Sequence, residues 1–174
     1  MTETWLLQSD IGIVSAALPD KYSIMSVCRP EGRGGGVALI CTLSISNIKQ
    51  IPRRMDVVSF EYMEISFCWR RRCFRLVVYS PGHPETDVDF LREFGSLLEV
   101  LLTLNGELLI LGDFNYWIDN PHLKPYTTEF LELLDLNNII NQVSGPIHVR
   151  GHTLDLLLTP RDMDVINCAK IMPI

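Results

Sequence analysis

Apolar and polar positions along the chain predict strands in its first half. Residues 22–29 and 37–44 are strand-like segments joined by the glycine-rich stretch "PEGRGGG", which is typical of a hairpin. A second pair of segments, 57–67 and 74–80, is separated by the arginine-rich stretch "CWRRRC". The first half of the chain is therefore predicted to contain two consecutive hairpins.

The pattern changes to helical spacing after position 86. Thr86 is a suitable N-cap, and Asn105–Gly106 supplies a stop. Between them the apolar residues recur every three or four positions, at Phe90, Leu91, Phe94, Leu97, Leu98 and Leu101. This spacing predicts an amphipathic helix that begins at Asp87.

The next apolar stretch is short and continuous. The run from Leu108 to Leu111 is consistent with a strand buried on both faces, and Gly112 permits a sharp turn after it. Asp113 and Asn115 are therefore expected to emerge together at the carboxyl end of that strand.

The last part of the chain predicts one more helix and one more strand. Thr127 or Thr128 can cap a short helix that runs through Leu134, and "RGHTLDLLLT" predicts a strand over 153–159 that ends at Pro160. No repeat, low-complexity segment or linker interrupts the sequence. Residues 1–174 are therefore predicted to form a single α+β domain of layered sheets flanked by helices.

The composition agrees with one folded domain. The chain has 174 residues, and 47% of them are hydrophobic, which is enough for a sizeable core. No apolar run approaches the ~20 residues that are needed to cross a bilayer. The first ten residues carry Glu3 and Asp10 in place of a basic start and an apolar run, so they do not resemble a secretory signal. We expect an intracellular location, with the nucleus as one option.

The cysteine content and the net charge limit which binding partners the sequence predicts. The five cysteines form no C-x-x-C pair, and their odd number argues against a disulfide framework or a zinc site. We therefore expect reduced cysteines and no disulfide-linked partner, and the sequence leaves the oligomeric state open. The formal net charge of −6 gives no general attraction to nucleic acid, so a nucleic-acid contact would need a local basic patch.

The stretch "CWRRRCFR" is one such patch. Arg70, Arg71, Arg72 and Arg75 could grip a nucleic-acid backbone while Trp69 stacks on a base. A solvated hairpin tip explains the same residues equally simply. The glycines of "GRGGG" precede a strand and not a helix N-terminus, so they indicate a turn and no phosphate cradle.

Asp113 and Asn115 have the chemistry that phosphodiester hydrolysis needs. A carboxylate can orient or deprotonate water, and a neutral amide can hold the phosphate. The bland alternative is an Asx turn that closes the preceding strand. The two residues alone leave both readings open.

Five short stretches occurring in order extend this reading to almost the whole chain. They are "TETWL" at 2–6, "GRGGGVALI" at 32–40, "VVYSPG" at 77–82, "LILGDFN" at 109–115 and "GHTLDLLLT" at 151–159. Together they resemble the endonuclease/exonuclease/phosphatase superfamily, and in particular the apurinic/apyrimidinic-like endonuclease domain of non-LTR retrotransposons. The resemblance implies a DNase I-like four-layer α/β/β/α sandwich and a DNA substrate.

The resemblance also assigns roles to individual residues. Glu3 matches the glutamate that binds a catalytic divalent metal, Mg²⁺ or Mn²⁺, a hard cation suited to carboxylate oxygen. Tyr79 matches a tyrosine that contacts the scissile phosphate. Asp113 matches the residue that activates the attacking water, and Asn115 matches one that holds the water and the phosphate. Asp155 matches an aspartate that orients a catalytic histidine.

Two parts of the family pattern are not found in residues 1–174. The sequence contains no Ser-Asp-His motif to supply that histidine, and it begins at the glutamate motif without the first family strand. We therefore expect an endonuclease of retroelement type with impaired activity. One alternative is a catalytically inactive retroelement-derived fragment that binds nucleic acid or a protein, and another keeps catalysis but acts on a phosphoinositide or a sugar phosphate.

Overall fold

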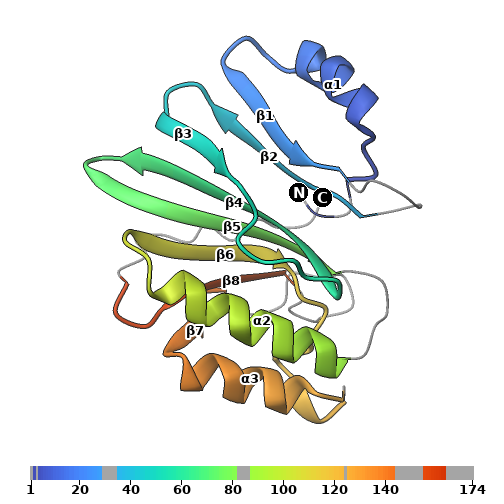
Figure 1. The fold of residues 1–174 in the computed structure, drawn as a ribbon, viewed down its shortest axis with the longest axis vertical. Helices are drawn as coiled ribbons and strands as arrows, with labels where there is room; N and C mark the ends of the chain where they lie inside the picture. Colours follow the sequence, from blue (N-terminus) through green and yellow to red (C-terminus); the bar gives the residue numbers. More distant parts are fainter. Residues whose placement is uncertain are drawn as a thin grey trace.

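A computed structural model describes the protein over residues 2, 4–28, 35–81, 87–123, 125–143 and 155–163. These residues form a mixed α+β fold with a six-stranded sheet, a two-stranded sheet and three α-helices (Figure 1). The larger sheet has the strand order β3-β4-β5-β6-β8-β7. Its strands are β3 (Ser46–Ile51), β4 (Phe60–Trp69), β5 (Arg72–Pro81), β6 (Glu107–Asp113), β7 (Ile139–Asn141) and β8 (Asp155–Pro160).

The smaller sheet is the antiparallel hairpin of β1 (Tyr22–Val27) and β2 (Val37–Thr42). It confirms the first predicted hairpin, and the antiparallel pair β4–β5 confirms the second. The helices are α1 (Ile11–Ala17), α2 (Asp87–Leu102) and α3 (Thr127–Leu136), with single 3₁₀ turns at Gln8–Asp10 and Pro121–Leu123. Within the described residues, no helix has the length and apolar character that a membrane span requires.

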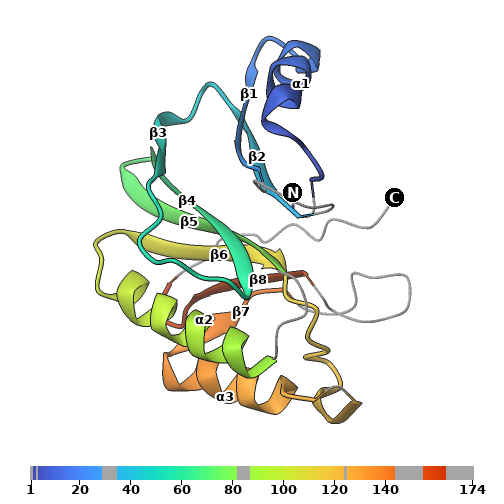
Figure 2. The same ribbon diagram turned by 45° about the vertical axis from the view of Figure 1, so that its right-hand side comes forward.

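The elements are stacked in layers (Figure 2). Helices α2 and α3 cover one face of the larger sheet, the β1–β2 hairpin faces the other, and α1 lies beside β1. Side chains of β5 alternate between two clusters: Val77 packs on the helix side, whereas Val78 packs with Val37 of β2. Covered faces on both sides explain why the central strands are almost continuously apolar.

Rings dominate the cluster between the larger sheet and its helices. Phe94 of α2 and Phe130 of α3 lie 6.0 Å apart, centroid to centroid, and Phe90 stacks on Phe94 at 5.3 Å. Phe60 of β4 meets Phe90 and Phe94 edge-on. Because aromatic side chains bury large apolar areas, this cluster is the main core of the protein.

Helix boundaries match the sequence prediction better than helix caps do. α2 confirms the helix that begins at Asp87, while its expected cap Thr86 lies outside the described residues. At α3 the prediction of a threonine cap is wrong, because Tyr126 holds the N-cap position with φ 61°. Thr127 is fully buried instead, and within the described residues its Oγ1 has no hydrogen-bond partner.

The last strand begins close to its predicted start, and three other elements were not predicted. β8 ends at Pro160 as expected and begins at Asp155; the two preceding positions of the predicted strand lie outside the described residues. The sequence pattern did not reveal α1, β3 or β7. All three are short and mostly half-buried or exposed.

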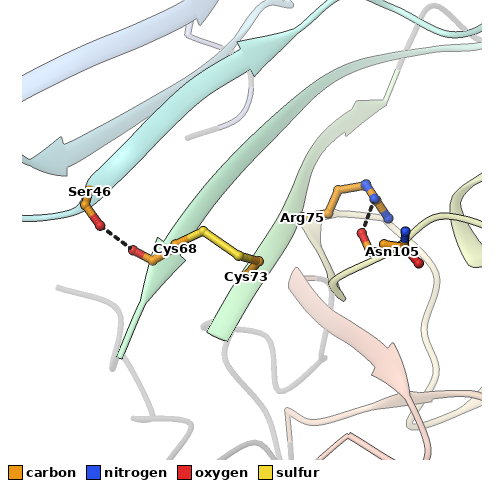
Figure 3. The surroundings of a disulfide bond; sticks show 5 residues. All are labelled: Ser46, Cys68, Cys73, Arg75 and Asn105. Carbon is orange, nitrogen blue, oxygen red and sulfur yellow. Dashed lines mark hydrogen bonds between the residues drawn. A yellow bond between two sulfur atoms is a disulfide. The ribbon is translucent and has the colours of Figure 1, made fainter. Parts of the chain in front are cut away.

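A disulfide between Cys68 and Cys73 corrects the expectation of five reduced cysteines (Figure 3). The two residues are register partners across β4 and β5, and their Cα atoms are 4.2 Å apart. Ser46 of β3 donates a hydrogen bond of 3.1 Å to the Cys68 carbonyl on the other side. A C-x₄-C spacing gives no signal by itself, because the cysteines become neighbours only when the hairpin register is known. Cys28 and Cys41 are free thiols.

One buried carboxylate, Glu64 of β4, joins two arginines. Its side chain is 1% exposed, and it accepts from Arg54 Nε at 2.7 Å and from Arg54 Nη2 at 3.0 Å. Arg75 Nε lies 3.1 Å from Glu64 Oε1. Arg75 also donates to the carbonyl of Leu101, in the last turn of α2. A second hydrogen bond from Arg75 goes to the carbonyl of Asn105, just after the helix (Figure 3). Burial lowers the pKa of the Arg75 guanidinium, and the Glu64 carboxylate opposes that shift.

This geometry corrects the grouping of Arg75 with the exposed arginines of its stretch. The Arg75 side chain is 10% exposed and faces Glu64, so it is used within the fold. Arg75 lies on the same face of β5 as Val77, which packs on the helix side, whereas the hairpin tip at Arg70 and Arg71 is exposed. The period-2 alternation of a strand therefore places Arg72 and Arg75 on opposite faces of β5, while Arg70 and Arg71 belong to the loop.

We predict that Glu64→Ala lowers the free energy of unfolding by about 3–5 kcal/mol, because it leaves the buried Arg75 guanidinium without its counter-charge. The measurement is urea denaturation followed by circular dichroism. Asp135→Ala is the matched control, since it removes an ion pair with Arg161 whose side chains are 79% and 58% exposed. It should cost less than about 1 kcal/mol, and equal losses in the two variants would contradict the importance of the buried site.

A second carboxylate, Glu93 of α2, explains why β4 begins at Phe60 although the apolar pattern begins at Val57. Glu93 Oε2 accepts from the N–H groups of Val58 and Ser59 at 3.0 Å each, and from the Ser59 hydroxyl at 2.7 Å. These backbone donors point to the helix instead of a strand partner. Burial raises the pKa of Glu93, but the three hydrogen bonds outweigh it, so the pKa lies below its usual value.

We predict that this carboxylate makes the fold acid-sensitive. Because the pKa of Glu93 is lower in the folded chain than in the unfolded one, its stabilisation is present above the usual glutamate pKa of 4.5 and is lost as pH falls through the folded value. Glu93→Gln should flatten the fall in thermal midpoint between about pH 5 and pH 3, whereas Glu99→Gln, at an exposed position of the same helix, should not. Identical pH profiles for wild type and Glu93→Gln would contradict this account.

Candidate functional site

Two carboxylates face each other across neighbouring strands. Asp113 ends β6 and Asp155 begins β8, and the two residues are register partners in the antiparallel β6–β8 pair. Register partners on one face have Cβ atoms roughly 5 Å apart, and like charges in such a position destabilise a sheet. Residues 42 positions apart in the sequence therefore meet where β6 ends and β8 begins, a place that we call the acidic edge. Folding alone does not favour this arrangement.

The pair lies on the sheet face that is turned away from α2 and α3. Leu108 and Ile110 of β6 pack into the helix-side cluster, whereas Leu109 and Leu111 pack on the side of β1 and β2. Alternation along the strand places Asp113 on the face of Leu109 and Leu111. There Asp113 is half-buried and Asp155 is exposed.

Asn115 is held at this edge by its two neighbours. Phe114 and Tyr116 are only 2% and 3% exposed, and Phe114 meets Phe94 edge-on at 5.5 Å. Tyr116 stacks on Phe130 at 4.6 Å and donates a 2.9 Å hydrogen bond from its hydroxyl to Asp87. Because both flanking side chains are anchored in the core, the residue between them is turned outward and exposed.

The backbone at this point is an Asx turn, as the alternative to a catalytic role anticipated. Asn115 has φ 53°, and its N–H donates a 2.9 Å hydrogen bond to Asp113 Oδ1. Among the described residues this is the one hydrogen bond of the Asp113 carboxylate, so Oδ2 is not used by the turn. An Asx turn and a reactive carboxylate are therefore compatible here.

Tyr79 lies one strand away from the acidic pair. In β5 it is the parallel register partner of Gly112, the residue before Asp113. Tyr79, Asp113, Asn115 and Asp155 thus lie at or next to the ends of three adjacent strands, and their shared role stays a prediction. Glu3, the predicted metal ligand, lies outside the described residues.

Glu61, which no sequence pattern indicated, also belongs to this edge of the larger sheet. Glu61 of β4 is the register partner of Ser80, the residue after Tyr79. Its carboxylate accepts a 2.5 Å hydrogen bond from the N–H of Gly36, just before β2. Gly36 in turn accepts from Thr4 N–H at 3.2 Å. Glu61 therefore ties the start of β2, and the N-terminal residues beside it, to the edge that carries Tyr79.

The predicted nucleic-acid contact lies at the other end of β5. Trp69 and Arg72 close a hairpin whose two loop residues, Arg70 and Arg71, have φ 50° and 66°. Left-handed backbone costs a residue with a Cβ roughly 1–2 kcal/mol. Arg72 pairs with Glu107 of β6, which leaves Arg70, Arg71 and Trp69 as the outermost residues of the tip. At ~3.3 Å per residue, the tip is on the order of 20 Å from Tyr79.

The acidic edge offers the donor type that a divalent cation prefers. Carboxylate oxygens suit hard cations such as Mg²⁺, and the Asp113–Asp155 pair supplies them on one face. Within the described residues there is no group of three or more His, Cys, Asp or Glu side chains placed to hold a metal. The described part of the edge therefore fits a metal in chemistry and supplies only part of a ligand set.

Comparisons with known proteins identify the fold. No protein-family model matches the chain, and its sequence has no significant match among curated proteins. Solved structures do match. The endonuclease domain of TRAS1, a telomere-specific non-LTR retrotransposon, superposes with a TM-score of 0.61 at 11% identity, over 89% of this chain and 80% of its own.

Two further structures agree with this match. The 3′ phosphatase NExo from Neisseria, bound to a product DNA hairpin, has a TM-score of 0.55 at 11% identity, over 91% of this chain and 74% of its own. An endonuclease/exonuclease/phosphatase family protein from Leptotrichia buccalis has a TM-score of 0.53 at 12% identity, over 86% and 64%. These matches confirm the resemblance to the endonuclease/exonuclease/phosphatase superfamily at the level of the fold. Identities this low establish a shared fold and no shared activity.

We predict that Asp113→Asn stabilises the chain in the absence of divalent metal. The amide keeps an oxygen for the Asn115 N–H and removes one of two facing charges, so the free energy of unfolding should rise by about 0.2–1 kcal/mol. Denaturation in EDTA measures it. Asp162→Asn, at an exposed position beyond the other end of β8, is the control and should have no effect. Destabilisation by Asp113→Asn alone would mean that the carboxylate serves only the turn.

Proposed function

We propose that this protein is a metal-dependent phosphodiesterase that hydrolyses DNA, an endonuclease of the retroelement type. The observation that carries the proposal is the facing of Asp113 and Asp155 across β6 and β8. Two carboxylates opposed at a strand end cost stability, and chains keep such conflicts where a site needs them. The shared fold with a retrotransposon endonuclease domain supports the choice of reaction.

The proposed mechanism gives each residue of the edge one task. Asp113, through Oδ2, accepts a proton from the attacking water and orients it in line with the phosphorus. Asn115, turned outward between its anchored neighbours, donates from its side-chain amide to a phosphate oxygen. The Tyr79 hydroxyl contacts a second phosphate oxygen. Asp155 serves in the family to orient a histidine, and here it also adds negative charge beside Asp113.

The residues of this edge suit Mg²⁺ or Mn²⁺. Glu3 would hold the metal with carboxylate oxygen, and the bound cation would offset the negative charge of the carboxylates and of the phosphate. Without such a cation, the acidic pair would repel a polyanionic substrate. The need for a cation fits the position of the arginines, because the basic hairpin tip lies at the other end of β5 from the described carboxylates.

The activity of residues 1–174 is proposed to be low. No Ser-Asp-His motif occurs in them, so the histidine that would stabilise the transition state is not supplied by this sequence. In the same proposal the layers seen here are part of a four-layer α/β/β/α sandwich of DNase I type. Residues 1–174 would then be one domain of that architecture.

A second candidate function is a nucleic-acid or protein binding module without catalysis. One observation favours it: Asp113 Oδ1 is engaged by the Asn115 N–H, which is the turn geometry expected when the aspartate is structural. The two candidates differ in whether the substitution of Asp113 changes a reaction rate.

The test is plasmid nicking with Mg²⁺ by the wild-type chain, by Asp113→Asn, and by a chimera that adds a family first strand and a Ser-Asp-His tail. We predict slow nicking by wild type and a gain in the nicking rate of ~10²-fold or more in the chimera. When catalytic groups act as a set, the loss of one group removes most of the rate enhancement that the whole set supplies. Asp113→Asn in the chimera should remove that gain.

Asp162→Asn in the chimera is the control, because it removes an exposed carboxylate at the far end of β8. Its rate should match that of the unsubstituted chimera. A folded chimera that never nicks DNA would favour the binding module. Robust nicking by residues 1–174 alone, abolished by Asp113→Asn, would show that the histidine is dispensable.

A further inference from the structure

The two loop residues at the tip of the β4–β5 hairpin are not the residues that its turn type prefers. Cys68 pairs with Cys73 and Trp69 with Arg72, which leaves a two-residue loop. Positive φ at both loop residues is the pattern of a type I′ turn, in which Asn-Gly is strongly preferred. This chain places Arg70 and Arg71 there, two residues that adopt the conformation with strain.

Three interactions hold the strained tip in place. The Cys68–Cys73 disulfide fixes the strands directly beneath it. The Arg70 guanidinium lies 4.4 Å from the centroid of the Trp69 ring, and Arg72 forms an ion pair with Glu107. Strain that is supported in this way points to a function for the residues that carry it.

The tip also differs from the rest of the molecule in charge. The whole chain has a formal charge of −6, yet Arg70 and Arg71 stand side by side and exposed, with Trp69 52% exposed beside them. An exposed indole next to two guanidinium groups offers a stacking surface and two phosphate contacts within one small area.

We propose that this tip is a binding surface for single-stranded nucleic acid, with Trp69 stacking on a base while Arg70 and Arg71 contact the flanking phosphates. Alternating phosphates and planar bases match this combination of groups. The tip lies at the opposite end of β5 from Tyr79, so the surface is separate from the acidic edge. The choice of nucleic acid rests on the proposed function, whereas the existence of the surface does not.

The decisive variant is R70N/R71G, which installs the residues that a type I′ turn prefers. A purely structural tip would gain stability from it and lose nothing. We expect a higher thermal midpoint together with at least tenfold weaker binding. Binding is followed by fluorescence anisotropy of a labelled single-stranded oligonucleotide of about 16 nucleotides, in EDTA, so that neither metal nor cleavage contributes.

Three more variants test three contributions to binding separately: the positive charge at positions 70 and 71, base stacking by Trp69, and the net charge of the whole chain. R70K/R71K keeps both charges and should retain most of the affinity. Trp69→Ala should weaken binding about tenfold, as expected for one stacked base. R92Q/R161Q removes two positive charges from other exposed positions, giving the same net charge as R70N/R71G, and should bind like wild type.

Salt dependence gives an independent readout. Two phosphate contacts predict a slope of log K against log salt of about −1.4 for a single strand, and R70N/R71G should bring it close to zero. Unchanged affinity and slope in R70N/R71G would overturn the proposal. Equal binding of a poly-glutamate peptide or of anionic phospholipid vesicles, lost in the same variants, would overturn the choice of nucleic acid. Because the assay requires no catalysis, its outcome is independent of the nicking experiment.

Discussion

Glu64 needs its two guanidinium partners because its carboxylate lies almost wholly outside water, where an unpaired charge is very costly. Arg54 reaches it from the connection between β3 and β4, and Arg75 reaches it from β5. Arg75 then donates to the carbonyls of Leu101 and Asn105, so the end of α2 is tied to the sheet. Satisfying one buried charge thus fixes the helix against the strands.

That attachment also sets where β6 begins. Gly106 follows Asn105 with φ 101°, and a Cβ at this position would lie 3.2 Å from the Cys73 carbonyl. The chain therefore turns tightly beside the β4–β5 hairpin and enters β6 as the parallel neighbour of β5. Asp113 ends that strand seven residues after the turn. The position of the candidate site follows from the buried ion pairs through the end of α2.

The sequence predicted the elements with a strong apolar period and missed those without one. The helix at α2 and the strands β4, β5 and β6 carry continuous patterns, and the structure contains them. α1 buries no residue and β3 is a polar edge strand, so neither had a pattern to detect. The pairing of Asp113 with Asp155 depends on β8 lying between β6 and β7, a long-range arrangement that only the family resemblance could suggest.

Local preference and the global fold disagree at two places. Arg70–Arg71 lie at one end of β5, and the Asp113–Asp155 pair lies near its other end. Elsewhere in the central strands the apolar pattern, the register and the packing agree, as expected for a foldable chain. The side chains at the two places also carry opposite charge. A polyanion is attracted to the arginine tip and repelled by the carboxylate edge, unless a cation occupies that edge. In the two proposals, binding at the tip therefore needs no metal, whereas a reaction at the edge does.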